Sequence, residues 1–171
     1  MTDTLKTLKC PACQKEMMKI FIPSEGVNLD VCLNGCGGIY FDTREYNYFD
    51  EPHENIEELL AAMKGKTFKK VDESLPRSCP ACGARMTKHF ASGKMAVQID
   101  DCYFCGGKFL DNGELQKIRA EYKTQAERDE ASVKLLYNVV GAELRAHQKE
   151  TEEAKKFSSY FKRVFDAIMG F

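Results

Sequence analysis

The sequence predicts a small α+β fold, with two tandem modules followed by an α-helical C-terminal region. Each module is a β-hairpin flanked by two cysteine-bearing turns. Three observations predict this fold. All eight cysteines fall in one pattern that occurs twice. Between the cysteine pairs of each copy, apolar residues alternate around a turn, as in a β-hairpin. From residue 112 to the end there is no proline, and strong helix formers dominate.

The composition limits the classes of protein to consider. With 171 residues, 43% hydrophobic and 30% charged, the chain is not generally disordered. No apolar run approaches the roughly 18–20 residues that cross a bilayer, and the N-terminus lacks the apolar stretch of a secretory signal. We therefore expect a cytoplasmic protein, in which eight cysteines indicate metal or redox chemistry rather than disulfides. The formal net charge of −1 argues against electrostatic coating of nucleic acid.

The repeat spans residues 8–46 and 78–115, which we call the first and second modules. The cysteine spacing is C-x2-C-x18-C-x3-C in the first module and C-x2-C-x19-C-x2-C in the second. Two short-spaced pairs supply the four thiolates that hold zinc tetrahedrally. A CPxC pair also suits a thiol oxidoreductase, but that chemistry uses one pair, whereas this chain has four. The pattern predicts two zinc ions per chain, with these metal ligands: Cys10, Cys13, Cys32, Cys36, Cys79, Cys82, Cys102 and Cys105.

The turns and hairpins follow in the same order in each module. Pro11 or Pro80 restricts the backbone of the turn that carries the first cysteine pair. A hairpin with its turn at 23–26 or 91–94 comes next. Glycines follow the second pair, and we expect them to adopt a left-handed conformation that directs backbone N–H groups at sulfur.

Several other residues recur at equivalent places. Met17 and Met86 are expected to fill the space beneath the first cysteine pair of each module. Asp30 and Asp100 precede the third cysteine by two residues, and we expect them to hydrogen-bond to nearby backbone at the hairpin exit.

Each module ends in an Asp-x-x-Glu sequence that favours a helix start. Asp42 or Asp111 stands at the expected N-cap, with Glu45 or Glu114 three residues later. The predicted order in each module is therefore cysteine turn, hairpin, cysteine turn and helix start.

This pattern resembles the zinc ribbon of the bacterial transcription-factor-IIB-type zinc-finger family. The resemblance rests on CPxC, a hairpin, and then CxxCGG with a following DNGEL, and it is close from Cys79 through Leu115. The first module departs from it in two places, an extra residue within Cys32–Cys36 and TREY in place of NGEL. The resemblance implies two tandem four-cysteine zinc ribbons, each with two zinc knuckles. It also implies a context of nucleic acid or polymerase.

No residue set in the sequence predicts catalysis. Four thiolates close a structural zinc site, whereas a catalytic one keeps an open position. We therefore predict no catalytic residues and no enzyme activity. The three histidines lack ligand spacing to any cysteine pair, and we interpret His53, His89 and His147 as surface or packing residues.

The intervals between motifs predict the domain boundaries. Residues 1–50 form the first ribbon, 51–76 a helical and basic linker, 77–116 the second ribbon, and 117–171 an α-helical tail. Within the linker, apolar residues at helical spacing predict a helix over 52–65 that Gly65 ends. The basic stretch after this helix predicts a flexible connection.

The tail carries two apolar stripes and then a basic amphipathic segment, 155–171. It is either one long helix or two to three packed ones. Three interpretations of 155–171 remain open: a core or oligomer helix, a helix that docks in a partner's groove, and a helix on a membrane surface. The predicted partner-binding residues are Phe157, Tyr160, Phe161, Val164, Phe165, Ile168, Lys162 and Arg163.

The sequence thus favours a non-catalytic, zinc-binding adaptor or regulatory protein. Its partner is expected to be a protein or large assembly in transcription or other nucleic-acid machinery, an inference from the resemblance. Direct nucleic-acid contact through the lysines at 64–70 and self-association through the tail are further options. The alternatives are a zinc or redox sensor that uses the irregular first site, and a peripheral membrane adaptor anchored by 155–171.

Overall fold

The computed structural model describes residues 6–169. The chain forms two compact units, which divide between Arg128 and Asp129, and we describe each unit by itself. The first unit contains both cysteine modules. The second unit consists of the greater part of one long helix.

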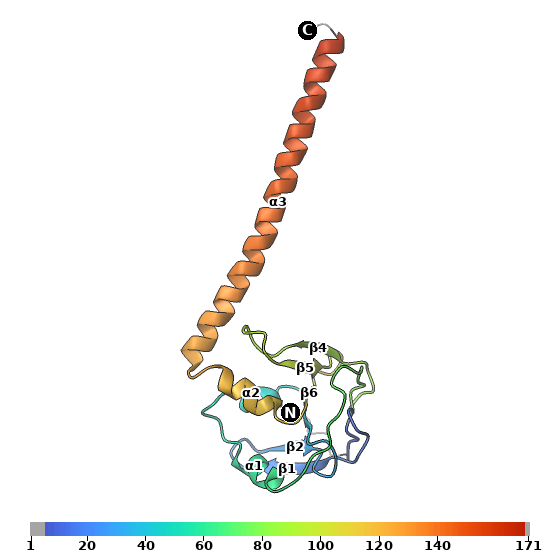
Figure 1. Ribbon diagram of the computed structural model, residues 1–171, viewed down its shortest axis with the longest axis vertical. Helices are drawn as coiled ribbons and strands as arrows, with labels where there is room; N and C mark the ends of the chain where they lie inside the picture. Colours follow the sequence, from blue (N-terminus) through green and yellow to red (C-terminus); the bar gives the residue numbers. More distant parts are fainter. Residues whose placement is uncertain (1–5, 170–171) are drawn as a thin grey trace. The chain divides into compact units, whose positions relative to one another are not determined.

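Both predicted hairpins are present. In the first module β1 (Met18–Ile22) pairs antiparallel with β2 (Val27–Val31), and in the second β4 (Thr87–Phe90) pairs antiparallel with β5 (Gln98–Asp101). A short third strand follows each second cysteine pair, β3 (Ile39–Phe41) beside β2 and β6 (Lys108–Leu110) beside β5. Figure 1 shows the strands of the two modules within the first unit.

The two modules join into one antiparallel sheet of six strands, in the order β1-β2-β3-β6-β5-β4. The junction is the pair β3–β6, in which Tyr40 lies opposite Phe109. These two residues hold equivalent positions in the repeat, so an approximate two-fold axis passes between them. The sequence pattern gives no indication of this pairing, because each module taken alone already has the elements of a ribbon.

The sheet separates two clusters of buried side chains. Because successive strand residues point to opposite faces, Ile39 and Phe41 enter one cluster while Tyr40 enters the other. The first cluster is an aliphatic and aromatic core that also contains Leu59 and Leu115 from the helices. The second cluster contains most of the cysteines with Tyr40 and Phe109.

Met17 and Met86 are buried in this second cluster, as the sequence predicted.

The ends of the modules differ from the predicted capping. The helices begin at the glutamates: η1 (Glu45–Tyr48) is a 3-10 turn and α2 (Glu114–Glu121) an α-helix, and neither has a side-chain N-cap. The predicted aspartate N-caps are therefore wrong. Instead each glutamate accepts a hydrogen bond from the aspartate's backbone N–H, at 2.8 Å for Asp42 and 2.7 Å for Asp111. The first helix stops early because EYNYFD contains weaker helix formers than ELQKIRAE.

The linker is more structured than its composition indicates. Its helix, α1 (Glu57–Met63), is shorter than the predicted 52–65, because residues 52–53 form a turn and the helix begins only at Glu57. Left-handed Gly65 follows its end. Beyond Gly65 the chain has no regular element, yet it is fixed to the first module. The Lys69 N–H donates to the Gly35 carbonyl at 3.0 Å, and the ring of Phe68 lies against Gly37.

The predicted tail, 117–171, is divided between two helices: α2 ends at Glu121, and α3 (Gln125–Met169) begins after a short break. The long helix α3 runs through Gly141. Several apolar side chains of its described part are exposed, among them Val133, Leu136, Tyr137, Phe157 and Tyr160. The side chains of the other predicted partner-binding residues lie outside the described set; these are Phe161, Lys162, Arg163, Val164, Phe165 and Ile168. Within residues 6–169, no helix combines the length and apolarity that crossing a bilayer requires.

Candidate metal centres

The first cysteine pair of each module sits in a tight hydrogen-bonded turn. In the first module Gln14 N–H donates to the Cys10 carbonyl at 2.8 Å, and in the second Gly83 N–H donates to the Cys79 carbonyl at 2.9 Å. Both donors have a left-handed backbone, with φ of 62° and 78°. This turn brings the two sulfurs of a Cys-x-x-Cys pair to one side of the chain, as zinc knuckles require.

The second cysteine pair sits in a similar turn. Gly106 N–H donates to the Cys102 carbonyl at 2.7 Å, and Gly37 N–H donates to the Cys32 carbonyl at 3.0 Å. Gly37 and Gly106 have φ of 76° and 78°, which confirms the predicted left-handed glycines. The N–H groups of the following residues, Gly38 and Gly107, hydrogen-bond to the fourth cysteine sulfur of their modules.

The extra residue of the first module is accommodated next to Gly35. A Cβ at this position would lie 2.7 Å from the sulfurs of both Cys13 and Cys32, so no side chain fits. The backbone of Gly35 is not left-handed. Its function is therefore to leave space for sulfur.

The structure brings the eight predicted cysteines together in two sets of four. We call Cys10, Cys13, Cys32 and Cys36 the first site, and Cys79, Cys82, Cys102 and Cys105 the second site. Within each site all four sulfurs lie within 4.8 Å of one another. The nearest S···S distances are 3.3–3.4 Å in the first site and 3.5 Å in the second.

These distances fit a metal rather than a disulfide. All eight cysteines are free, and a disulfide would need S–S of about 2.05 Å. Tetrahedral zinc with Zn–S bonds of about 2.3 Å places sulfurs about 3.8 Å apart, close to the observed spacing. The two sites, one in each module, fit two zinc ions.

One thiol of each site has a lowered pKa, and it is the third cysteine in both. Hydrogen bonds from Cys10 and Cys36 lower the pKa of Cys32 to about 2. Burial acts to raise the pKa of Cys102, but hydrogen bonds from the Cys105 N–H and the Cys82 thiol outweigh it, and the pKa is lowered. Hydrogen bonds to Cys32 and Cys36, with burial adding to them, raise the pKa of Cys10, and burial raises the pKa of Cys79. Zinc must therefore displace protons from most of each set, which makes zinc binding pH-dependent.

The second site has a neighbour from the first module. The hydroxyl oxygen of Tyr40 lies 3.4 Å from the Cys79 sulfur and 3.8 Å from the Cys105 sulfur. Tyr40 is fully buried, and burial raises the pKa of its hydroxyl well above the usual value, so the group stays protonated. Sequence reasoning missed this residue, because only the β3–β6 pairing brings it to the second site.

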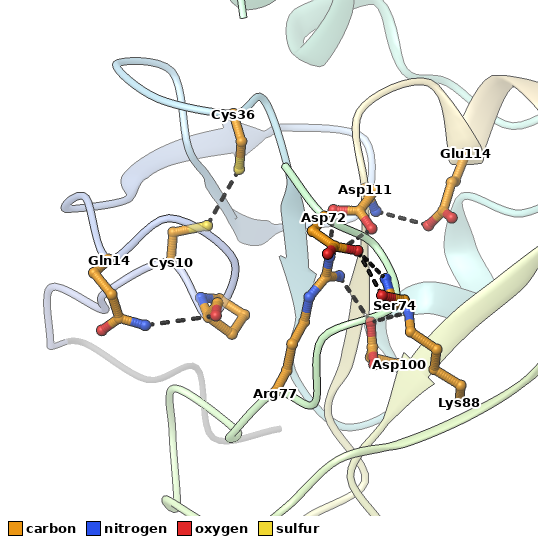
Figure 2. Close-up of polar contacts among 11 residues, drawn as sticks. Cys10, Gln14, Cys36, Asp72, Ser74, Arg77, Lys88, Asp100, Asp111 and Glu114 are labelled. Carbon is orange, nitrogen blue, oxygen red and sulfur yellow. Dashed lines mark hydrogen bonds and ion pairs between the residues drawn. The ribbon is translucent and has the colours of Figure 1, made fainter. Parts of the chain in front are cut away.

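A buried ion network adjoins the second module. Arg77 lies between two aspartates, with Nη1 2.7 Å from Asp100 and Nη2 2.8 Å from Asp111 (Figure 2). Its guanidinium also lies over the ring of Phe109, 4.9 Å from the centroid. Lys88 adds a second cation to Asp100 at 3.0 Å. Loss of either carboxylate would leave the buried charge of the arginine without full compensation.

The expectation that Asp30 and Asp100 bond to nearby backbone is therefore wrong for their main contacts. Asp100 accepts from Arg77 and Lys88, and Asp30 accepts from Lys19 at 3.1 Å. The lysines could have been identified from the sequence, because Lys19 and Lys88 are equivalent in the repeat. The position equivalent to Arg77 is Leu8.

Neither histidine with a described side chain joins either set of four sulfurs. His89 pairs with Asp101 at 2.7 Å, and His53 lies 3.3 Å from Glu51. His147 falls among the residues whose side chains are not described.

A third group, Glu73, Asp111 and Glu114, also brings carboxylate oxygens together. Arg77 and a backbone N–H already occupy two of these carboxylates, so we assign no metal there.

Comparison with protein families agrees with this geometry. Residues 9–48 and 78–121 each match the model of the family described as transcription factor zinc-finger. A comparison with curated proteins and one with solved structures find no match. Each matched region contains one complete four-cysteine site. The chain thus carries two tandem matches to the transcription factor zinc-finger family, one around each four-cysteine site.

Proposed function

We propose that this protein is a non-catalytic adaptor or regulatory protein, in which two zinc ions hold one rigid six-stranded sheet and α3 engages a macromolecular partner. The observation that carries the proposal is the closure of each site by four cysteine sulfurs within 4.8 Å of one another. Four thiolates fill the tetrahedral coordination of zinc and leave no position for substrate. Zinc binding contributes about 10–16 kcal/mol in peptide models, enough to fold modules of this size.

The second module offers one surface for a partner. Tyr103 and Phe104, between the last two cysteines, are 72% and 82% exposed, whereas Leu33 in the first module is buried. Adjacent exposed aromatic residues favour contact with protein or with unstacked nucleic-acid bases. The family resemblance supports transcription or other nucleic-acid machinery as the setting, and a cytoplasmic location is part of the proposal.

The helix α3 offers the other surface. Its exposed apolar residues include Val133, Leu136, Tyr137, Phe157 and Tyr160. A helix with such a stripe buries it in a partner's groove or against a second copy of itself. If α3 docks against a second copy of the chain, light scattering of the purified protein would detect the resulting oligomer.

The test compares three forms of the full-length protein as bait in affinity purification. One is the natural chain, one carries Phe157→Ser and Tyr160→Ser, and the matched control carries Glu152→Ser and Glu153→Ser on the same helix. We expect the natural chain and the control to retain the same partner and the Phe157/Tyr160 variant to lose it. Identical co-purifying proteins from all three would contradict docking through this face.

A second candidate function, a zinc or redox sensor, is favoured by the longer turn of the first site. Gly35 there lies against two sulfurs, so a small movement of the backbone changes the geometry of that site alone. Titration with peroxide while zinc release is followed tests this function. Early release of one zinc, with Cys10, Cys13, Cys32 and Cys36 oxidised first, supports it, and simultaneous release from both sites contradicts it.

A third candidate, attachment to a membrane surface through 155–171, is distinguished by flotation with anionic vesicles. Binding that is lost on Phe157→Ser and Tyr160→Ser supports it, and no binding of the natural chain excludes it.

A further inference from the structure

The two modules exchange an aromatic residue across their junction. The Tyr40 side chain, from the first module, lies on Gly107, where a Cβ would be 2.0 Å from its hydroxyl oxygen. The Phe109 side chain, from the second module, lies on Gly38, where a Cβ would be 2.3 Å from its ring. Each ring therefore covers the second glycine after the last cysteine of the opposite site. The exchange is symmetric except for one oxygen atom.

We propose that this oxygen makes Tyr40 a positioning residue of the second site, one that donates a hydrogen bond to the Cys79 sulfur and slows the loss of zinc from that site alone. The inference rests on the zinc occupancy of the proposed function. It goes beyond that function because it makes retention of one zinc depend on a residue of the other module.

The direction of the hydrogen bond follows from the chemistry of the pair. A zinc-bound cysteine is a thiolate without a proton, so the tyrosine hydroxyl is the donor. Within the described part of the chain, this hydroxyl lies within hydrogen-bonding distance of the sulfurs of Cys79 and Cys105. Tyr40 is fully buried, and a buried hydroxyl that donated to no partner would destabilise the fold.

A second contact from the first module strengthens the same connection. The Thr43 hydroxyl donates to the backbone carbonyl of Cys105, and its side chain lies against Gly106. Tyr40 and Thr43 thus both contact the second site. Tyr40 contacts its sulfurs, and Thr43 contacts the backbone of the turn that carries Cys105. Both belong to the segment that carries β3 and the residues after it.

The second site is the one that needs such support, because it is the more exposed. Cys82 is exposed and Cys105 half-buried, whereas in the first site only Cys13 is not fully buried. A hydrogen bond to a thiolate withdraws charge from sulfur and makes it a weaker target for protons. Removing such a partner of a metal ligand typically costs about 10–100-fold in metal affinity.

The experiment exchanges the oxygen between the two positions in the full-length, zinc-loaded protein. The variants are Tyr40→Phe, Phe109→Tyr and the double exchange. Each is mixed with excess chelator, and the released cysteines are alkylated and mapped by mass spectrometry, so that loss from each site is timed separately. Tyr40→Phe should speed release from the second site about tenfold or more and leave the first site unchanged. Phe109→Tyr should slow release from the first site.

A spectroscopic readout separates positioning from general loosening of the fold. In the cobalt(II)-loaded protein, the thiolate-to-cobalt charge-transfer band should move to longer wavelength in Tyr40→Phe, because the sulfur regains charge. Unchanged release from the second site, or equal acceleration at both sites, would overturn the inference. A natural chain that binds fewer than two zinc ions would instead contradict the proposed function, before the variants are compared.

Discussion

The two modules place equivalent cysteine turns in different surroundings. Arg77 of the second module corresponds to Leu8 of the first module in the repeat. At the junction of the sheet, Tyr40 faces the second site and Phe109 the first. The last turn contains a buried leucine and a glycine in the first module but two exposed aromatic residues in the second. The comparison indicates that the sulfur framework was kept while the residues that adjust stability and contacts diverged.

The largest effect should come from removing one ligand of either site. Cys13→Ser and Cys82→Ser should each weaken zinc binding at their own site only, so that a chelator removes one zinc per chain first, because three thiolates supply only part of a binding energy of about 10–16 kcal/mol. Elemental analysis gives the stoichiometry, and circular dichroism reports the loss of strand structure. Unchanged zinc affinity at the site of either variant would show that its cysteine is not a ligand.

Arg77→Leu makes the second module match the first at one position. We expect a loss of about 3–5 kcal/mol in the free energy of unfolding, because Asp100 and Asp111 then lose a buried cationic partner. Lys88→Met is the control, since Lys88 reaches Asp100 from a more exposed position and should cost much less. Denaturant unfolding with saturating zinc measures both, and equal losses would contradict the assignment of Arg77 as the central cation.

Gly35→Ala should weaken the first site alone. The added methyl group would lie 2.7 Å from two sulfurs, so the turn must open for zinc to bind. We expect about a 10–100-fold loss of zinc affinity at the first site, comparable with the effect of disturbing groups that hold a ligand in place. Competition with a chelator measures it, with Phe104→Ala in the corresponding turn of the second site as the control. Unchanged affinity at the first site would exclude a steric function for Gly35.

The last prediction concerns the dependence of stability on pH. Burial raises the pKa of Glu114 to about 7, with repulsion from Asp111 and Glu73 adding to it and Lys88 opposing it. The folded state therefore binds this proton more tightly than the unfolded state, and the stability it gives is lost as pH rises from about 4.5 through about 7. The slope reaches at most about 1.4 kcal/mol per pH unit.

Glu114→Gln should remove that slope. The measurement is the difference in unfolding free energy between the natural chain and the variant, because acid-driven zinc loss affects both equally. Parallel stability curves for the two proteins between pH 5 and 7 would contradict a raised pKa for Glu114.

Local patterns were predictable from the sequence, and contacts between the modules were not. Cysteine spacing identified both sulfur sets, and alternation around the turns identified both hairpins. The β3–β6 pairing involves strands of three residues each, too short to carry a pattern. The contacts of Tyr40 and Arg77 depend on that pairing or on the packing around it. The helix α3 is continuous because Gly141 alone does not end a helix of otherwise strong formers.

All eight cysteine sulfurs are expected to bind zinc, four at each of two tetrahedral sites. X-ray absorption at the zinc edge, combined with elemental analysis of the purified natural chain, tests it most directly. We expect two zinc ions per chain, each with four sulfur neighbours at about 2.3 Å. Fewer than two ions per chain, or nitrogen and oxygen in place of sulfur, would contradict it.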